Sequence, residues 1–108
     1  MALIVAQQIA RAGLEPALAA ADVAGDEFAN TGNEYVEILN GSGGDITATF
    51  VTPGTVDSLA VADRPVVVSA GERRKVGPFP TGTYNDSDGH VNITYSAVTT
   101  VTVGVFAL

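Results

Sequence analysis

The sequence contains no cysteine, no tryptophan and a single histidine among its 108 residues. Without cysteine the chain cannot form disulfides, thiolate nucleophiles or thiolate metal sites. Catalysis by a Ser or Thr nucleophile needs a histidine that a carboxylate orients, and His90 is the one candidate. Because His90 directly follows a turn, where side chains are usually exposed, we assign it no catalytic or metal role. The sequence predicts no catalytic residue, no cofactor and no enzymatic activity.

Positive charge and long apolar runs are also scarce. Five basic residues stand against twelve acidic ones, and the resulting formal charge of −7 repels a phosphate backbone. No apolar run approaches the ~18 residues that a transmembrane helix requires. The apolar start at residues 3–6 is too short for a signal peptide and lacks a positive flank. We therefore expect neither nucleic acid nor a membrane as a partner, and synthesis in the cytoplasm without export.

β-branched residues dominate what is present, with 15 Val and 11 Thr. Their stiff side chains favour strands over helices. From Asn30 onward, short apolar runs alternate with Gly, Asn, Asp and Pro, and we expect strands at residues 34–39, 46–51, 59–61, 66–68, 73–78, 91–95 and 101–107. The sequence predicts an all-β fold, a single antiparallel β-sandwich of about seven or eight strands.

Three connections carry strong local signals. Residues 40–44 read Asn-Gly-Ser-Gly-Gly, and their glycines predict the left-handed positions of a hairpin between the strands on either side. Residues 85–89 end in Asp-Gly and predict a second tight hairpin turn. Residues 77–80 contain two prolines, which cannot donate ladder hydrogen bonds, so this stretch is expected to cross between the sheets.

The first 27 residues differ from the rest of the chain. They are rich in alanine and are interrupted by Gly13, Pro16 and Gly25. Residues 17–24 are long enough for two helical turns at most, which is too short for a stable isolated helix. We predict an extended N-terminal arm at residues 1–27 and a β-sandwich domain at residues 28–108. The apolar arm residues that could contact a neighbouring subunit are Leu3, Ile4, Val5, Ile9 and Leu14.

Four of the five basic residues lie close together in sequence, namely Arg64 and the run Arg73-Arg74-Lys75. On a strand, Arg73 and Lys75 share one face and Arg74 takes the other. One interpretation is a solvated sheet edge that charge protects from pairing with other chains. The other is a docking point for an acidic partner surface, because Arg forms bidentate pairs with carboxylates. Both interpretations stay open at this stage.

The turn at residues 85–89 resembles the beginning of a calcium loop, because Asn85, Asp86 and Asp88 offer oxygens at close spacing. In that alignment the first and the last ligand positions fall on Tyr84 and Tyr95, which are not calcium ligands. An exposed turn explains the same residues. Whether Asp86 and Asp88 bind a cation is left open, and no metal site is predicted.

Several stretches spread over nearly the whole chain carry a family resemblance. They are Gln8-Ile9-Ala10-Arg11-Ala12-Gly13-Leu14 with Pro16, Gly25-Asp26-Glu27-Phe28 with Asn30-Thr31-Gly32, Ala70-Gly71-Glu72-Arg73, Gly77-Pro78-Phe79-Pro80, Tyr84-Asn85-Asp86, Asp88-Gly89 and residues 91–96. In these stretches the chain resembles small β-sandwich decoration (cement) proteins of tailed bacteriophages. The resemblance implies a non-enzymatic virion protein that binds the capsid exterior, with the major capsid protein as partner and a homotrimer as the assembled form. It transfers no site residue, because these proteins share no catalytic motif.

Two alternatives to a capsid decoration protein remain. A phage tail or head-completion protein would share the sandwich but would form rings at the neck or tail. A carbohydrate- or cell-surface-binding module belongs to another class and would present exposed aromatic side chains on a sheet face. The chain offers three Tyr and four Phe for such a platform and no Trp.

Overall fold

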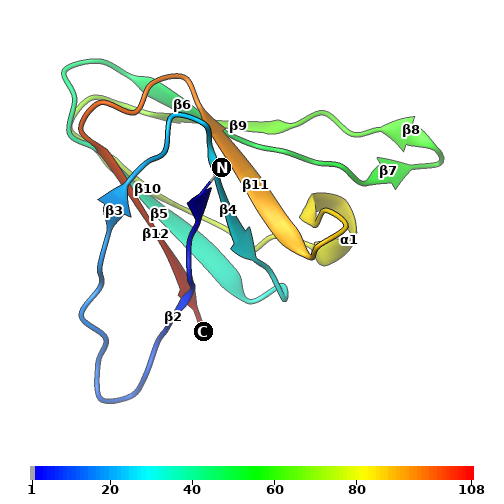
Figure 1. The fold of residues 1–108 in the computed structure, drawn as a ribbon, viewed down its shortest axis with the longest axis horizontal. Helices are drawn as coiled ribbons and strands as arrows, with labels where there is room; N and C mark the ends of the chain where they lie inside the picture. The colour runs from blue at the N-terminus through cyan, green and yellow to red at the C-terminus, as the bar shows by residue number, and fades with distance from the viewer. Residues whose placement is uncertain (1) are drawn as a thin grey trace.

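The computed structural model describes residues 2–108, so Met1 of the expected arm lies outside the described residues. The chain forms two mixed β-sheets, one separate hairpin and one short helix (Figure 1). The first sheet has the order β1-β4-β11-β6-β9, with β1 Ala2–Leu3, β4 Asp26–Ala29, β11 His90–Tyr95, β6 Ile46–Phe50 and β9 Arg64–Val68. The second has the order β10-β5-β12-β2, with β10 Arg73–Val76, β5 Glu34–Asn40, β12 Val101–Ala107 and β2 Gln7–Gln8, while β3 Ala19–Ala20 also pairs with β12. The hairpin is β7 Thr55–Val56 with β8 Leu59–Ala60, and the helix is α1 Thr81–Tyr84.

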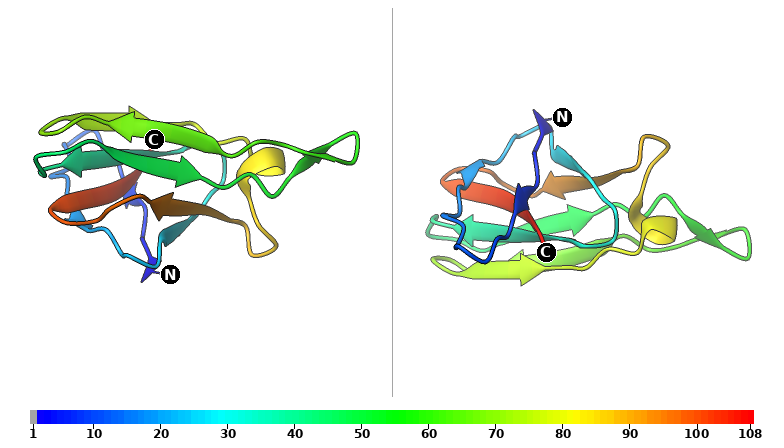
Figure 2. Two further views of the ribbon diagram at one scale, coloured as in Figure 1. Left: turned by 90° about the horizontal axis from the view of Figure 1, so that it is seen from above. Right: turned by 90° about the horizontal axis from the view of Figure 1, so that it is seen from below.

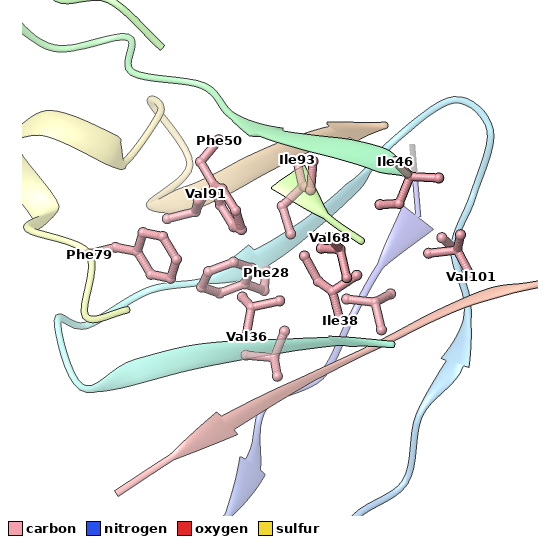
Figure 3. Close-up of a cluster of buried hydrophobic side chains, with 14 of the residues drawn as sticks. Phe28, Val36, Ile38, Ile46, Phe50, Val68, Phe79, Val91, Ile93 and Val101 are labelled. Carbon is pink, nitrogen blue, oxygen red and sulfur yellow. The ribbon is translucent and has the colours of Figure 1, made fainter. Parts of the chain in front are cut away.

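The inner faces of the two sheets form the core, as the alternation in the sequence predicts (Figure 3). On β6, Ile46, Ala48 and Phe50 are buried while the threonines between them are half-exposed. Strands β11 and β12 follow the same rule with Val91, Ile93 and the valines of β12. Phe79 packs against this layer although it lies on no strand, with its ring centroid 5.0 Å from that of Phe50 and 5.6 Å from that of Phe28. Burying one such ring stabilises the fold by about 1.5–3 kcal/mol.

The expected hairpin at residues 40–44 is wrong. Strands β5 and β6 belong to different sheets, so the loop between them crosses the sandwich. Asn40 holds this crossing from a fully buried position, because its Nδ2 donates to the carbonyls of Gly44 at 2.8 Å and Val68 at 2.9 Å. Its Oδ1 accepts from the backbone N and the hydroxyl of Ser42. The loop glycines have no positive φ, since a side-chain anchor replaces the tight turn.

The prediction of a purely antiparallel sandwich fails at the N-terminal segment. Strand β1 runs parallel to β4 in one sheet, and β2 runs parallel to β12 in the other. The segment thus bridges both sheets on one side of the sandwich before β3 pairs antiparallel with β12 (Figure 2). The Gln7 amide closes the intervening loop, because its Nε2 donates to the Ala17 carbonyl at 2.7 Å and its Oε1 accepts from the Ala17 N at 2.9 Å.

The connection between β10 and β11 crosses from one sheet to the other, as the two prolines predict. Residues 85–89 form a turn in which Gly89 has φ +77° and its N donates to the Asp86 carbonyl at 3.1 Å. The expectation of a hairpin at this turn is wrong, because helix α1 precedes it instead of a strand. Tyr84, at the end of α1, packs its ring 5.2 Å from Phe79, and this contact places the helix against the core.

Gly104 on β12 lets the N-terminal segment approach the outer face of its sheet. A Cβ at this position would lie 2.9 Å from the Ala17 carbonyl oxygen and 2.6 Å from Leu18 Cδ2. We expect Gly104→Ala to push the segment away, because the close contact with Ala17 involves backbone, which yields less easily than a side chain. Overpacking of this kind lowers the free energy of unfolding by about 1–3 kcal/mol.

Hydrogen exchange measures the effect directly. The amides of Ala17, bonded to Gln7, and of Ala21, bonded to the Val101 carbonyl, should exchange faster in the Gly104→Ala variant. Gly43→Ala is the matched control, since a Cβ there meets nothing within 4 Å. Unchanged exchange at both amides in Gly104→Ala would contradict the close docking of the segment.

Candidate functional site

The basic run lies on β10, the last strand of its sheet, which pairs with β5 on one side. Arg73 Nη1 is 3.8 Å from Glu37 Oε2, and Lys75 Nζ is 3.7 Å from Glu37 Oε1. Arg74 contacts a different acid, with its Nη2 2.7 Å from Glu72 Oε1. The side chains of Arg73 and Lys75 therefore share one face of the strand and Arg74 takes the other, which confirms the predicted alternation.

Glu37 explains why two cations face outward at this place. Its side chain lies on the outer face of the sheet and is only 8% exposed, and a buried carboxylate needs a compensating charge. Arg73 and Lys75 supply that charge but remain 59% and 65% exposed. Two cations against one carboxylate leave this face of β10 net positive and open to solvent.

Arg64 begins β9, the last strand of the other sheet, and its Nε donates to Tyr84 Oη at 3.1 Å. A groove of about 910 Å³ lies between the two edge strands and is lined by residues of both. Arg64 and Lys75 are among its lining residues, as are the buried rings of Phe79 and Tyr84. The structure thus brings Arg64 and Lys75 to one groove, whereas Arg73 and Arg74 are outside its lining.

Beside this groove a hairpin projects from the body, with β7 and β8 paired to each other (Figure 1). Val56 and Leu59 flank its turn and are 66% and 69% exposed. Sequence reasoning missed the hairpin, because it treated residues 59–61 as a strand of the sandwich. The sequence gives only a weak turn signal here. Asp57 and Ser58 adopt left-handed backbone conformations, φ 54° and 63°, whereas Asn and Gly are the usual residues at such positions.

The five apolar residues assigned to an inter-subunit arm lie in two environments. Leu3 and Val5 are 58% and 78% exposed, whereas Ile4 between them packs against the core. Ile9 and Leu14 are half-buried and line a groove of about 360 Å³ on the outer face of the second sheet. The arm is therefore placed against its own sandwich, and Leu3 and Val5 are the members that face solvent.

The same small groove contains the aromatic pair of the outer face. The rings of Tyr35 and Phe106 are stacked with centroids 5.5 Å apart. Phe106 is buried and Tyr35 is half-buried, and Glu37, Arg73 and Lys75 also line this groove. In a sugar-binding platform both rings would be open to solvent, whereas in this pair only Tyr35 keeps part of its surface exposed.

His90 is half-buried rather than exposed as its position after a turn suggested. Its Nδ1 lies 3.4 Å from Glu27 Oε1 on the neighbouring strand β4, and the two side chains are 22% and 29% exposed. The side chain is covered because β11 pairs directly with β4 from its first residue. This contact joins two strands of one sheet.

The side chain of Asp26 anchors the end of the N-terminal segment through two hydrogen bonds. Asp26 is 1% exposed, and its Oδ2 accepts from Tyr95 Oη at 2.7 Å and from the backbone N of Asp22 at 3.3 Å. Burial, followed by the hydrogen bond to Asp26, raises the pKa of Tyr95 far above its ordinary value. The phenol therefore stays protonated and keeps donating to Asp26 over the whole range of ordinary pH.

Asp86 acts as the centre of its turn. Its Oδ1 accepts from the backbone N of Asp88 at 2.9 Å and of His90 at 3.0 Å, and its Oδ2 accepts from Asn92 Nδ2 at 2.9 Å. The Asn92 bond, then the backbone bond from His90, hold the pKa of Asp86 below its ordinary value. Within residues 2–108 no group of three or more His, Asp or Glu is arranged to hold a metal ion.

No family model, no curated protein and no solved structure matches this chain. Among the described residues no helix is long and apolar enough to cross a membrane.

The lowered pKa of Asp86 makes part of the stability dependent on pH. A carboxyl whose folded pKa lies below its unfolded value stabilises the fold above the unfolded value, about pH 4, and this contribution is lost as pH falls through the folded value. Asp86→Asn should therefore destabilise the protein most at neutral pH. The difference from the natural chain should shrink below about pH 4.

Urea unfolding at pH 7, 4 and 3 checks this expectation. Asp88→Asn is the matched control, since it removes a neighbouring charge whose exposed carboxylate accepts no hydrogen bond from residues 2–108. A difference between Asp86→Asn and the natural chain that stays constant over this pH range would show that the carboxylate of Asp86 has no stabilising role.

Proposed function

We propose that this protein is a non-enzymatic decoration (cement) protein that binds the outer surface of a tailed-phage capsid and stabilises it. The major capsid protein is then its partner, and a homotrimer is its assembled form. The chain would be made in the host cytoplasm and would act on the virion. The sequence resemblance supports this proposal, and one structural observation carries it. Four of the five basic residues lie on two neighbouring open strand edges of an otherwise acidic molecule.

Such a charge distribution suits docking in one orientation. The basic side chains of β10 would face acidic groups on the capsid, while the acidic remainder would be repelled from them. The same negative charge keeps free copies soluble and apart before assembly. Docking at this strand would also cover backbone groups that the sheet leaves unpaired at β10.

The stabilisation of a capsid by such a protein adds up over many copies. A capsid presents many identical sites, so each copy needs only a weak contact for the particle as a whole to gain stability. The arm would contribute through Leu3 and Val5, whose side chains are exposed and could contact a neighbouring subunit. Ile4, Ile9 and Leu14 would keep the arm in place on its own sandwich.

Replacing Arg73, Arg74 and Lys75 by Ala should weaken capsid binding by on the order of tenfold at low ionic strength and by less at high ionic strength. The reason is that salt screens contacts between exposed charges. The measurement is co-sedimentation with particles of the phage that carries the gene, at two salt concentrations.

Two controls separate docking from folding. Arg11→Ala removes the one basic residue outside the two edge strands, in the loop between β2 and β3, and should leave binding unchanged. The triple replacement is also made with Glu37→Gln, because the unpaired Glu37 carboxylate would otherwise destabilise the sheet. Equal affinity of the natural chain and the rescued triple variant at both salt concentrations would exclude docking through β10.

The position on the particle distinguishes decoration from the head-completion alternative. Leu108 is 78% exposed, so a label at this end should leave the fold intact. Decoration predicts label over the whole head in electron micrographs of purified particles. Label confined to the neck or tail would contradict decoration and would favour a tail or head-completion protein.

A further inference from the structure

The hairpin β7–β8 is firmly held at its base and uncovered at its tip. The buried Thr52 ties the two ends together, since its N donates to Asp63 Oδ1 at 2.9 Å and its Oγ1 donates to the Val61 carbonyl at 2.8 Å. Gly54 lies against α1, where its N donates to the Thr83 carbonyl at 3.1 Å. The base is thus fixed on the sandwich, whereas the hairpin projects from the body (Figures 1 and 2). Val56 and Leu59 at its turn are exposed.

The projecting part of this hairpin has little stability of its own. A two-stranded hairpin is marginally stable in water, and here both turn residues occupy left-handed positions that favour glycine. Exposure of Val56 and Leu59 to water is also unfavourable in free energy, and burying these side chains would remove that penalty. A surface that receives Val56 and Leu59 would therefore stabilise the hairpin as well as bind it.

The groove between β9 and β10 has the properties of such a surface. Its volume of about 910 Å³ falls in the range of pockets that enclose a medium-sized ligand. Pro65, Val66, Pro78 and Phe79 give it apolar walls, and its charged lining residues, Arg64 and Lys75 against Asp63, leave it net positive. The hairpin offers the complement, two apolar side chains with the acidic Asp57 in the turn between them.

The hairpin cannot fill the groove of its own chain. Val61, Ala62 and Asp63 at the hairpin base already form part of the groove lining, and the ladder of β7 with β8 points the tip away from the body (Figure 1). Bringing the tip back would require breaking the Thr52 contacts that fix the base. The occupant therefore has to come from another molecule.

We infer that the occupant is a second copy of this chain, with Val56 and Leu59 of one copy seated in the groove between β9 and β10 of the next. Tip and groove are different surfaces, so the contact is heterologous and closes into a ring when the rotation between copies allows it. This inference rests on the homotrimer in the proposed function and names the contact that would hold it. A ring of three would use every hairpin and every groove.

The absence of cysteine makes a clean crosslinking experiment possible. Leu59→Cys is placed on one chain and Thr83→Cys, in the groove lining, on a second chain that carries a mass tag. After mixing and mild oxidation, the tagged and untagged chains should join through a disulfide, because the two thiols belong to different molecules. Leu59→Cys mixed with tagged Val23→Cys is the control, since Val23 is 82% exposed in the N-terminal segment.

Mass measurement in solution gives an independent readout. The natural chain should form a closed oligomer, and Val56→Asp with Leu59→Asp should shift it to monomer with an unchanged circular dichroism spectrum, because both residues are outside the core. A monomeric natural chain would overturn the inference, as would crosslinking to Thr83→Cys that does not exceed crosslinking to Val23→Cys. Both measurements use the protein without capsids, so a failure here would leave capsid binding to be decided by co-sedimentation.

Discussion

The edges of the two sheets are the constraint on which the rest of this structure depends. Every sandwich ends in strands whose outer backbone groups are unpaired, and such strands invite association with other chains. The two pairs of sheet edges in this chain differ (Figure 2). On one side the N-terminal segment pairs with β4 and with β12, and on the other side β9 and β10 stay open. The open side is where four of the five basic residues, the groove and the projecting hairpin lie.

Closing the first side requires several compatible features. The segment can lie on β12 because Gly104 leaves room for Ala17 and Leu18. The Gln7 amide then replaces the backbone partner that Ala17 lacks, and Ile4 adds apolar contact with the core. An arm of this kind is part of the fold rather than an appendage, and its exposed residues are limited to one face.

Local signals in the sequence were sufficient for β5, β6, β11 and β12 and for their inward faces. Alternation along residues 46–50 and 101–107 reflects burial on one side of a strand, which neighbouring residues already encode. Pro65 also lies on an edge strand, as its missing N–H requires. The assignment of strands to sheets was not predictable in this way, because the crossing after β5 depends on Asn40 reaching the Val68 carbonyl 28 residues away. The parallel pair of β2 with β12 depends likewise on a contact across nearly the whole chain, since Gln7 lies opposite Phe106.

The candidate site also combines features that the sequence predicts with features that depend on strand pairing. The charge run and its two faces were visible in the sequence, but the burial of Glu37 between Arg73 and Lys75 was not, since it arises from pairing of β5 with β10. That pairing has a functional consequence. Arg73 and Arg74 are outside the lining of the large groove, and Lys75 is the member of the run that contributes to it. A neighbour's hairpin seated in the groove would thus leave the exposed side chains of Arg73 and Arg74 uncovered. The proposed self-association and the proposed docking on an acidic surface would then be compatible on the same side of the molecule.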